Sequence, residues 1–228
     1  RYASADRCPN ARPFRDELYR MTALIAAQKF QYTDLPSAYC LFDTFGDDET
    51  DEVMENALEF RRYSRTLPER FSKQADRIFA RWEENRAGLE KRYAKLPTSV
   101  FQADLNDTNV LLDEQGRFAG IYDFNLAGKD VFLNYLFQEI YEGSLAEERN
   151  AILAALQVCA GVYRFSDAEK EAALPLYRCL KPLWFTRVEA LKDAGTDETA
   201  IQKCLDEMEC AQTQDINFRG AMEQPQPA

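Results

Sequence analysis

The residues best suited to chemistry lie in one segment, "FQADLNDTNVLLDEQGRFAGIYDF", at residues 101–124. Asp104 and Asn109 lie in a turn-like stretch, and Asp123 follows the second of two apolar runs. Carboxylate and amide oxygens are hard ligands, which suit Mg²⁺ better than a soft metal. Because Mg²⁺ usually completes its shell with water and substrate phosphates, the pattern predicts a nucleotide or phosphorylated substrate. The DxxxxN spacing alone is a weak signal, and it favours an Asx-rich turn that leads into a hairpin over a functional site.

The elements that must position these residues are a hairpin and a set of helices. "NVLL" and "RFAGIYDF" flank the turn sequence "DEQG", whose Gly can take positive φ, so we expect a β-hairpin. Apolar residues at helical spacing predict helices on both sides of it. The expected helices cover residues 13–30, a stretch beginning after Thr50, and residues 68–93, 131–141, 145–163, 167–192 and 196–218, with Pro175 and Pro182 starting or kinking the one at 167–192. The predicted fold is α+β and mostly α-helical, with one small sheet element.

The whole segment resembles the catalytic centre of the aminoglycoside phosphotransferase family, whose core motif reads approximately HGDxxxxN, a hairpin, then IDF. "QADLNDTN", the length of the hairpin and "YDF" all agree with it. This family is the small-molecule branch of the protein-kinase-like fold. The resemblance implies that Asp104 is the catalytic aspartate, which orients the acceptor hydroxyl and takes its proton. It also implies that Asn109 and Asp123 are Mg²⁺ ligands and that ATP is the second cofactor.

Five further positions matter for this resemblance. Leu111 and Tyr122 resemble the residues beneath adenine, although ordinary hairpin packing would explain them equally well. Gln102 stands where the family usually has His, and Ala103 stands where it usually has Gly. Asn134 stands in place of the Asp of a downstream helix. These departures leave open a weak or specialised enzyme and a degenerate one that binds without turnover.

The resemblance covers the C-terminal lobe of such a kinase, with the small hairpin carrying the metal site. We expect this lobe at residues 13–218, an N-terminal extension or hinge remnant at 1–12, and a disordered tail at 219–228. The family's N-terminal lobe has a five-stranded sheet and a phosphate-holding lysine, and no such run of strands precedes Phe14. Either that lobe was removed or it never existed, and Arg1 as an unusual native start favours removal. The missing N-terminal lobe is therefore an expected partner.

Composition excludes several kinds of protein. The absence of histidine among the 228 residues rules out a Ser/His/Asp triad, a Cys/His dyad and a histidine-ligated zinc site. A net charge of −11 argues against nucleic acid as a partner. No run approaches the roughly 18 to 20 apolar residues of a membrane span, and no secretory signal begins the chain. Scattered cysteines without a CxxC pair favour reduced thiols, so we expect a cytoplasmic protein without a membrane partner.

The acidic residues within 43–59 have two interpretations. They could receive the amino groups of a cationic acceptor, or they could form a solvated loop followed by the acidic first turn of a helix. Trp82 and Trp184 lie on apolar helical stripes, which predicts core packing. The functional hypothesis is an ATP- and Mg²⁺-dependent kinase that phosphorylates a hydroxyl of a sugar, amino sugar or amino alcohol. The alternative is a non-catalytic kinase-like module that binds other proteins through its helical surface.

Overall fold

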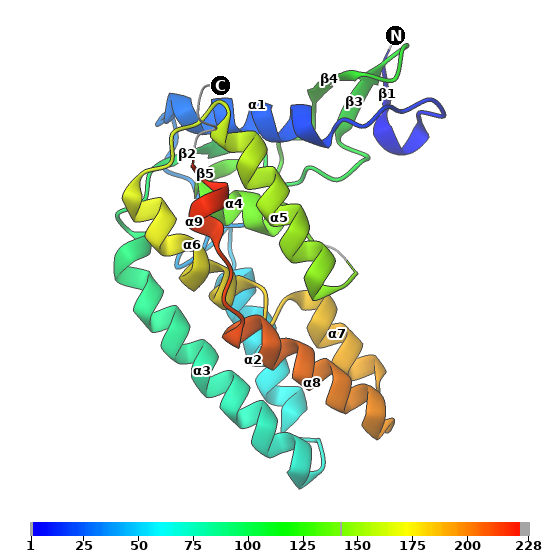
Figure 1. Cartoon of the computed structure of the whole chain (residues 1–228), viewed down its shortest axis with the longest axis vertical. Coiled ribbons are helices and arrows are strands. Elements are labelled where there is room, and N and C mark those ends of the chain that lie inside the picture. The colour runs from blue at the N-terminus through cyan, green and yellow to red at the C-terminus, as the bar shows by residue number, and fades with distance from the viewer. Residues whose placement is uncertain (1, 142, 224–228) are drawn as a thin grey trace.

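The computed structural model describes residues 2–141 and 143–223, and it is mostly helical with two small antiparallel sheets (Figure 1). The helices are α1 (Arg15–Gln28), α2 (Glu52–Ser64), α3 (Glu69–Tyr93), α4 (Phe132–Glu139), α5 (Leu145–Ala160), α6 (Asp167–Leu180), α7 (Phe185–Asp193), α8 (Glu198–Thr213) and α9 (Phe218–Ala221), with a 3-10 turn η1 at Ala5–Arg7. The strands are β1 (Tyr2–Ser4), β2 (Thr98–Phe101), β3 (Val110–Asp113), β4 (Phe118–Ile121) and β5 (Gly128–Val131). The predicted mostly helical α+β class is confirmed.

The hairpin predicted from "NVLL" and "RFAGIYDF" is formed by β3 and β4, which pair antiparallel. Gly116 closes the turn at φ +73°, and a Cβ at this glycine would lie 2.1 Å from the carbonyl oxygen of Asn10. Arg12 donates its backbone N–H to the Gly116 carbonyl at 2.8 Å. The turn therefore requires glycine both for its backbone conformation and for the close approach of the N-terminal segment.

Two sheet pairings were not predicted from the sequence. β1 adds to the free edge of β3, with Ser4 opposite Leu111, so part of the predicted extension at 1–12 belongs to the hairpin sheet. β2 pairs antiparallel with β5, and these strands bracket the segment that holds Asp104, Asn109 and Asp123. Strands of this length carry too few residues to show a clear alternation, and their partners are distant in sequence. The expectation of a single small sheet element was wrong for this reason.

The helical core is organised around α3, which packs against α2, α6 and α8. In Figure 1, α2, α3, α7 and α8 form the lower half of the molecule, whereas α1 and the two sheets lie in the upper half. Trp82 in α3 is 1% exposed, and its indole Nε1–H donates to the Cys179 carbonyl at 2.9 Å. Trp184 is 4% exposed. The prediction of core packing is confirmed for Trp82, whereas Trp184 is buried but also lines a cavity.

The predicted helix at 167–192 was wrong, because the chain breaks it into α6 and α7. α6 ends at Leu180, α7 begins at Phe185, and Pro182 lies between them. Proline lacks an N–H and clashes with the preceding helical turn, which explains the break there. Pro175, in contrast, lies inside α6 without ending it.

The predicted tail at 219–228 begins too early in the sequence analysis. α9 spans Phe218–Ala221, and Met222 is only 1% exposed, so the core extends to this residue. Residues 224–228 of that prediction lie outside the described part of the chain. Among the described helices, none is both long enough and apolar enough to cross a membrane.

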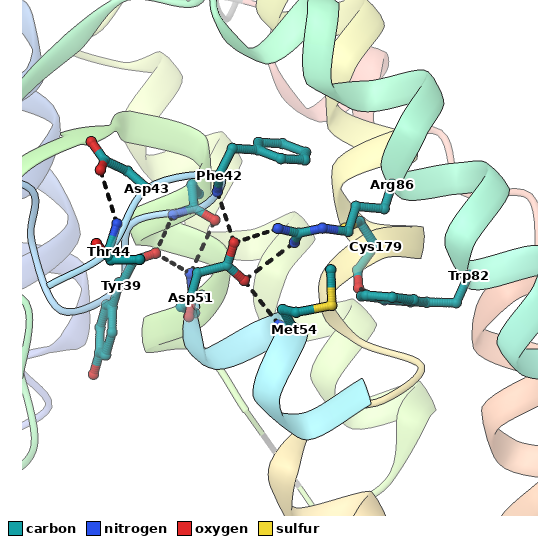
Figure 2. Close-up of polar contacts among 11 residues, drawn as sticks. Tyr39, Phe42, Asp43, Thr44, Asp51, Met54, Trp82, Arg86 and Cys179 are labelled. Carbon is teal, nitrogen blue, oxygen red and sulfur yellow. Dashed lines mark hydrogen bonds and ion pairs between the residues drawn. The ribbon is translucent and has the colours of Figure 1, made fainter. Parts of the chain in front are cut away.

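Asp51 shows how the acidic segment supports the start of α2 (Figure 2). Its Oδ1 accepts the backbone N–H of Met54 at 2.9 Å, and its Oδ2 accepts that of Phe42 at 2.9 Å. Both oxygens also pair with the Arg86 guanidinium, which lies 4.4 Å from the centroid of the Phe42 ring. Asp51 therefore fits the structural interpretation of the acidic segment, in which acidic residues support the start of a helix. Its buried carboxylate caps α2 and is neutralised by an arginine.

Candidate active site

Asp104 lies in the loop that follows β2, and asparagine side chains hold its carboxylate. Asn109 Nδ2 donates to Asp104 Oδ2 at 2.8 Å and to the Asp104 carbonyl at 3.0 Å. Asn106 Nδ2 donates to Asp104 Oδ1 at 2.6 Å. Asn109 is 6% exposed, and its own N–H bonds to the Asn106 carbonyl at 2.9 Å, which fixes the loop on itself. The structure therefore brings two of the predicted site residues into direct contact.

Gln102 joins this loop to the third predicted residue, Asp123. Its Oε1 accepts the backbone N–H of Asp104 at 2.7 Å. Its Nε2 donates to the Tyr122 carbonyl at 3.1 Å and to the Asp123 carbonyl. Gln102 is 3% exposed, so water does not compete for these bonds. In the sequence Gln102 is visible only as a departure from histidine, and its bridging role was not predicted.

The possible metal ligands are Asn109 Oδ1 and the Asp123 carboxylate, and both accept only long hydrogen bonds. The nearest donor to Asn109 Oδ1 is the Thr108 hydroxyl at 3.4 Å. Asp123 is exposed, and its Oδ1 accepts one long bond from the Asn125 N–H at 3.4 Å. The described residues contain no cluster of three or more His, Cys, Asp or Glu arranged for a metal. One carboxylate and one amide still fit Mg²⁺, which commonly takes few protein ligands and completes its shell with water and phosphate.

Leu111 and Tyr122, the two residues predicted beneath adenine, belong to the hairpin and its end. Leu111 is half-buried in β3 and lies opposite Gly120 of β4. Tyr122 is 43% exposed, and its hydroxyl donates to the Thr108 carbonyl at 2.6 Å. The tyrosine thus bridges the hairpin end and the Asp104 loop. Contact with a nucleotide base stays a prediction for both side chains.

A cavity of about 660 Å³ opens beside Asp104 and is lined by residues from α1, α2, α4 and the turn between α6 and α7. Its wall combines acidic and aromatic side chains, among them Glu52, Asp104, Glu139, Tyr19, Tyr39 and Trp184. Arg15 also lines it, but its guanidinium pairs with Asp107 at 2.6 Å. The basic charge is therefore neutralised within the wall, and the acidic charge predominates.

Glu139, at the end of α4, is a buried acid of this cavity that the sequence analysis missed. Its carboxylate accepts the Leu105 N–H at 3.0 and 3.2 Å, next to Asp104. Burial is the main cause that raises the pKa of Glu139 to about 7; the Leu105 N–H opposes this shift, and the nearby Asp104 charge adds to it. Glu139 is the one charged residue in the run "FLNYLFQEI", which was the available signal in the sequence.

The comparison with known families decides the classification. The sequence model of the phosphotransferase enzyme family (APH) matches residues 6–134, more than half of the chain, and this range includes Asp104, Asn109 and Asp123. The chain belongs to the phosphotransferase enzyme family. The search of curated proteins found no significant match.

In this member of the family, the other two departures noted in the sequence also have visible structural roles. Ala103 is fully buried at φ +63°, a left-handed conformation that glycine adopts readily and that costs an L-residue roughly 1 to 2 kcal/mol. Asn134 is fully buried, and its Nδ2 donates to both carboxylate oxygens of Asp130 at 3.0 Å and to the Tyr39 carbonyl at 2.6 Å. Asn134 thereby connects β5, α4 and the cavity wall.

Proposed function

We propose that this phosphotransferase moves the γ-phosphoryl group of Mg²⁺·ATP to a hydroxyl group of a small molecule. The observation that carries the proposal is the Gln102 bridge. One amide binds the Asp104 N–H and the Asp123 carbonyl, so the two acids are held by the same side chain. Phosphoryl transfer demands little covalent chemistry from the protein and depends mainly on positioning and charge neutralisation. This reaction requires a rigid link between Asp104, which faces the acceptor hydroxyl, and Asp123, which faces the phosphates.

Each residue of the site has a distinct role in the proposed mechanism. Asp104 receives the proton of the acceptor hydroxyl, with its carboxylate aimed by the amides of Asn106 and Asn109. Asn109 Oδ1 and the Asp123 carboxylate hold Mg²⁺. When bound, the ion neutralises charge on the phosphate oxygens. Donation by Asn109 Nδ2 to Asp104 leaves its Oδ1 free for that ligation, so one side chain serves both halves of the site.

The wall of the cavity favours a cationic acceptor such as an amino sugar or an amino alcohol. Glu52 and Glu139 contribute carboxyl groups beside Asp104, and aromatic rings of Tyr19, Tyr39 and Trp184 line the same space. Aromatic faces attract organic cations, and carboxylates attract them over a longer range. For Glu52, the interpretation that the acidic segment receives the amino group of the acceptor still applies, whereas the neighbouring Asp51 caps α2. The cation would thus be bound close to the residue that receives the hydroxyl proton.

The test is a phosphorylation assay with [γ-³²P]ATP, MgCl₂ and three acceptors, namely choline, glucosamine and glucose. We expect transfer to an amine-bearing acceptor, loss of transfer on addition of EDTA, and loss of transfer in Asp123→Ala. Asp113→Ala is the matched control, because Asp113 lies at the opposite end of the hairpin and pairs with Arg117. Nucleotide binding without transfer to any hydroxyl compound would instead favour the non-catalytic binding module.

A further inference from the structure

Lys181 is a fully buried cation behind the wall of the cavity. It lies between α6 and α7 and is 0% exposed. Its Nζ donates to the Ile140 carbonyl at 2.6 Å and lies 4.4 Å from the centroid of the Trp184 ring. Ile140 and Trp184 both line the cavity beside Asp104. A single ammonium group therefore contacts two separate segments of the wall.

The charges around Lys181 come from each helix packed against it. Glu148 of α5 places Oε2 at 3.6 Å from Nζ, and Arg187 of α7 binds Glu148 Oε1 at 3.0 Å. Arg187 also donates to the Lys181 carbonyl at 2.8 Å. The backbone N–H of Lys181 donates to the carbonyl of Tyr177 in α6 at 2.9 Å. Burial and Arg187 lower the pKa of Lys181 to about 8, whereas Glu148 opposes the shift. Burial and Glu148 raise the pKa of the Tyr177 phenol, which stays neutral throughout.

Trp184 is the part of the wall on which this ammonium acts most directly. Its ring contacts the Lys181 ammonium and also the Phe185 ring, whose centroid is 5.5 Å away. Within residues 2–141 and 143–223, its indole Nε1–H has no hydrogen-bond partner. The orientation of the ring therefore depends on packing and on the cation rather than on a bond from its own N–H. Removing the cation should release the ring.

We propose that Lys181 is a positioning residue that sets acceptor affinity by holding Trp184 and Ile140 in the cavity wall. The proposal rests on the proposed function, since the cavity is taken as the acceptor site. Lys181 does not touch the acceptor, and its effect passes through the residues that do. Protonated Lys181 binds the Trp184 face and Glu148 together, while the neutral amine retains only its bond to the Ile140 carbonyl.

This role predicts opposite trends with pH for binding and for stability. The contribution of Lys181 to acceptor affinity should fall as pH rises through about 8, where Lys181 loses its proton. The pKa of Lys181 is lower in the folded chain than its ordinary 10.5, so the unfolded state binds more protons between these values. The contribution of this group to stability therefore rises with pH over the same window. A residue with only a structural role would not weaken acceptor binding while stability improves.

The first experiment observes Trp184 without any ligand. ¹H–¹⁵N spectra of the protein are recorded from pH 6.5 to 9.5, and the two tryptophan indole signals are distinguished with Trp184→Phe. We expect the Trp184 signal to titrate with a midpoint near 8 and the titration to vanish in Lys181→Arg and Lys181→Gln. Lys203→Gln, an exposed lysine of α8 with 77% side-chain exposure, is the matched control. A Trp184 signal that does not move over this range, or that still titrates in Lys181→Arg, would overturn the proposal.

The second experiment measures the acceptor side with choline, whose positive charge does not titrate. Glu139 lies in the same cavity and gains charge over part of this range, so the choline Kd of the natural protein is compared with that of Lys181→Arg, which shares Glu139. We expect the ratio of the two Kd values to rise about three- to tenfold between pH 7 and pH 9. Lys181→Gln should bind choline more weakly than Lys181→Arg at both values, with ATP affinity unchanged within twofold. A ratio that does not change between pH 7 and pH 9 would contradict the role of Lys181. If choline fails to bind at all, the cationic acceptor is wrong, and the ligand-free titration still decides on Lys181.

Discussion

Replacing Gln102 with leucine should damage stability and turnover together. Gln102→Leu preserves much of the volume but removes the bonds to the Asp104 N–H and to the Tyr122 and Asp123 carbonyls. Each bond contributes about 1 kcal/mol net. Asp123 is exposed, so its carbonyl can bind water again, whereas the Asp104 N–H is partly buried. We expect the free energy of unfolding to fall by about 2 to 3 kcal/mol.

The same change should lower kcat more than a general loss of stability would. Without the bridge, Asp104 and Asp123 are no longer held by a common group, and misplacement by about 1 Å can cost up to 10²-fold in rate. Gln102→His is the matched variant, because a neutral imidazole offers one acceptor and one donor. It should retain most of the activity at pH 8 and lose it toward pH 6, since a protonated imidazole cannot accept the Asp104 N–H.

Urea denaturation followed by tryptophan fluorescence gives the stability, and steady-state kinetics at both pH values gives the activity. The reasoning would be refuted if Gln102→Leu unfolded within about 0.5 kcal/mol of the natural protein and kept its kcat. It would also be refuted if the histidine variant showed no dependence on pH relative to the natural chain.

Two further predictions concern neighbouring residues. Ala103→Gly should change the unfolding free energy by less than about 1 kcal/mol, because relief of the left-handed φ of +63° is offset by a lost buried methyl group and a more flexible unfolded chain. Ala103→Val, in contrast, should lower the unfolding free energy by more than about 2 kcal/mol. Urea denaturation of both variants tests the strain at this position, and equal unfolding free energies for the two would contradict it. Burial raises the pKa of Glu139 from 4.5 to about 7, so the folded state binds more protons in this window and stability should fall as pH rises through it, by roughly 3 kcal/mol at most. Glu139→Gln should flatten that slope in unfolding curves measured between pH 4.5 and 7.5, and an unchanged slope would show that the pKa of Glu139 is not raised.

Local patterns in the sequence predicted much of the fold. The apolar stripe on α3 and the turn at Gly116 each depend on residues near one another in the chain, and both were identified correctly. The pairing of β2 with β5 depends on strands far apart in sequence, and no alternation was long enough to indicate it. Pro182 was weighed as a kink or a start, and its missing N–H and steric clash explain the break, but the sequence alone did not distinguish a kink from a complete break.

The candidate site was predictable where its residues share a motif. Asp104 and Asn109 lie in direct contact within one loop, and Gln102 links the Asp104 backbone to the Asp123 carbonyl, whereas their roles in catalysis and metal binding stay predictions. Glu139 and Lys181 could not be identified in the same way, because their importance arises from burial beside partners from other helices. A buried glutamate and an exposed one look alike in a sequence, and the difference lies in the surrounding helices.

The most direct test of the central claim is Asp104→Asn in a phosphoryl-transfer assay combined with Mg²⁺·ATP titration. Asparagine keeps the size of the side chain and can still interact with Asn106 and Asn109, but it cannot receive the hydroxyl proton. Loss of a positioned base typically lowers the rate about 10²- to 10⁴-fold, a barrier increase of roughly 3 to 5 kcal/mol. The account predicts that kcat falls by this amount while Mg²⁺·ATP affinity stays within a few-fold of the natural protein. Turnover close to that of the natural protein would contradict the assignment of Asp104 as the base.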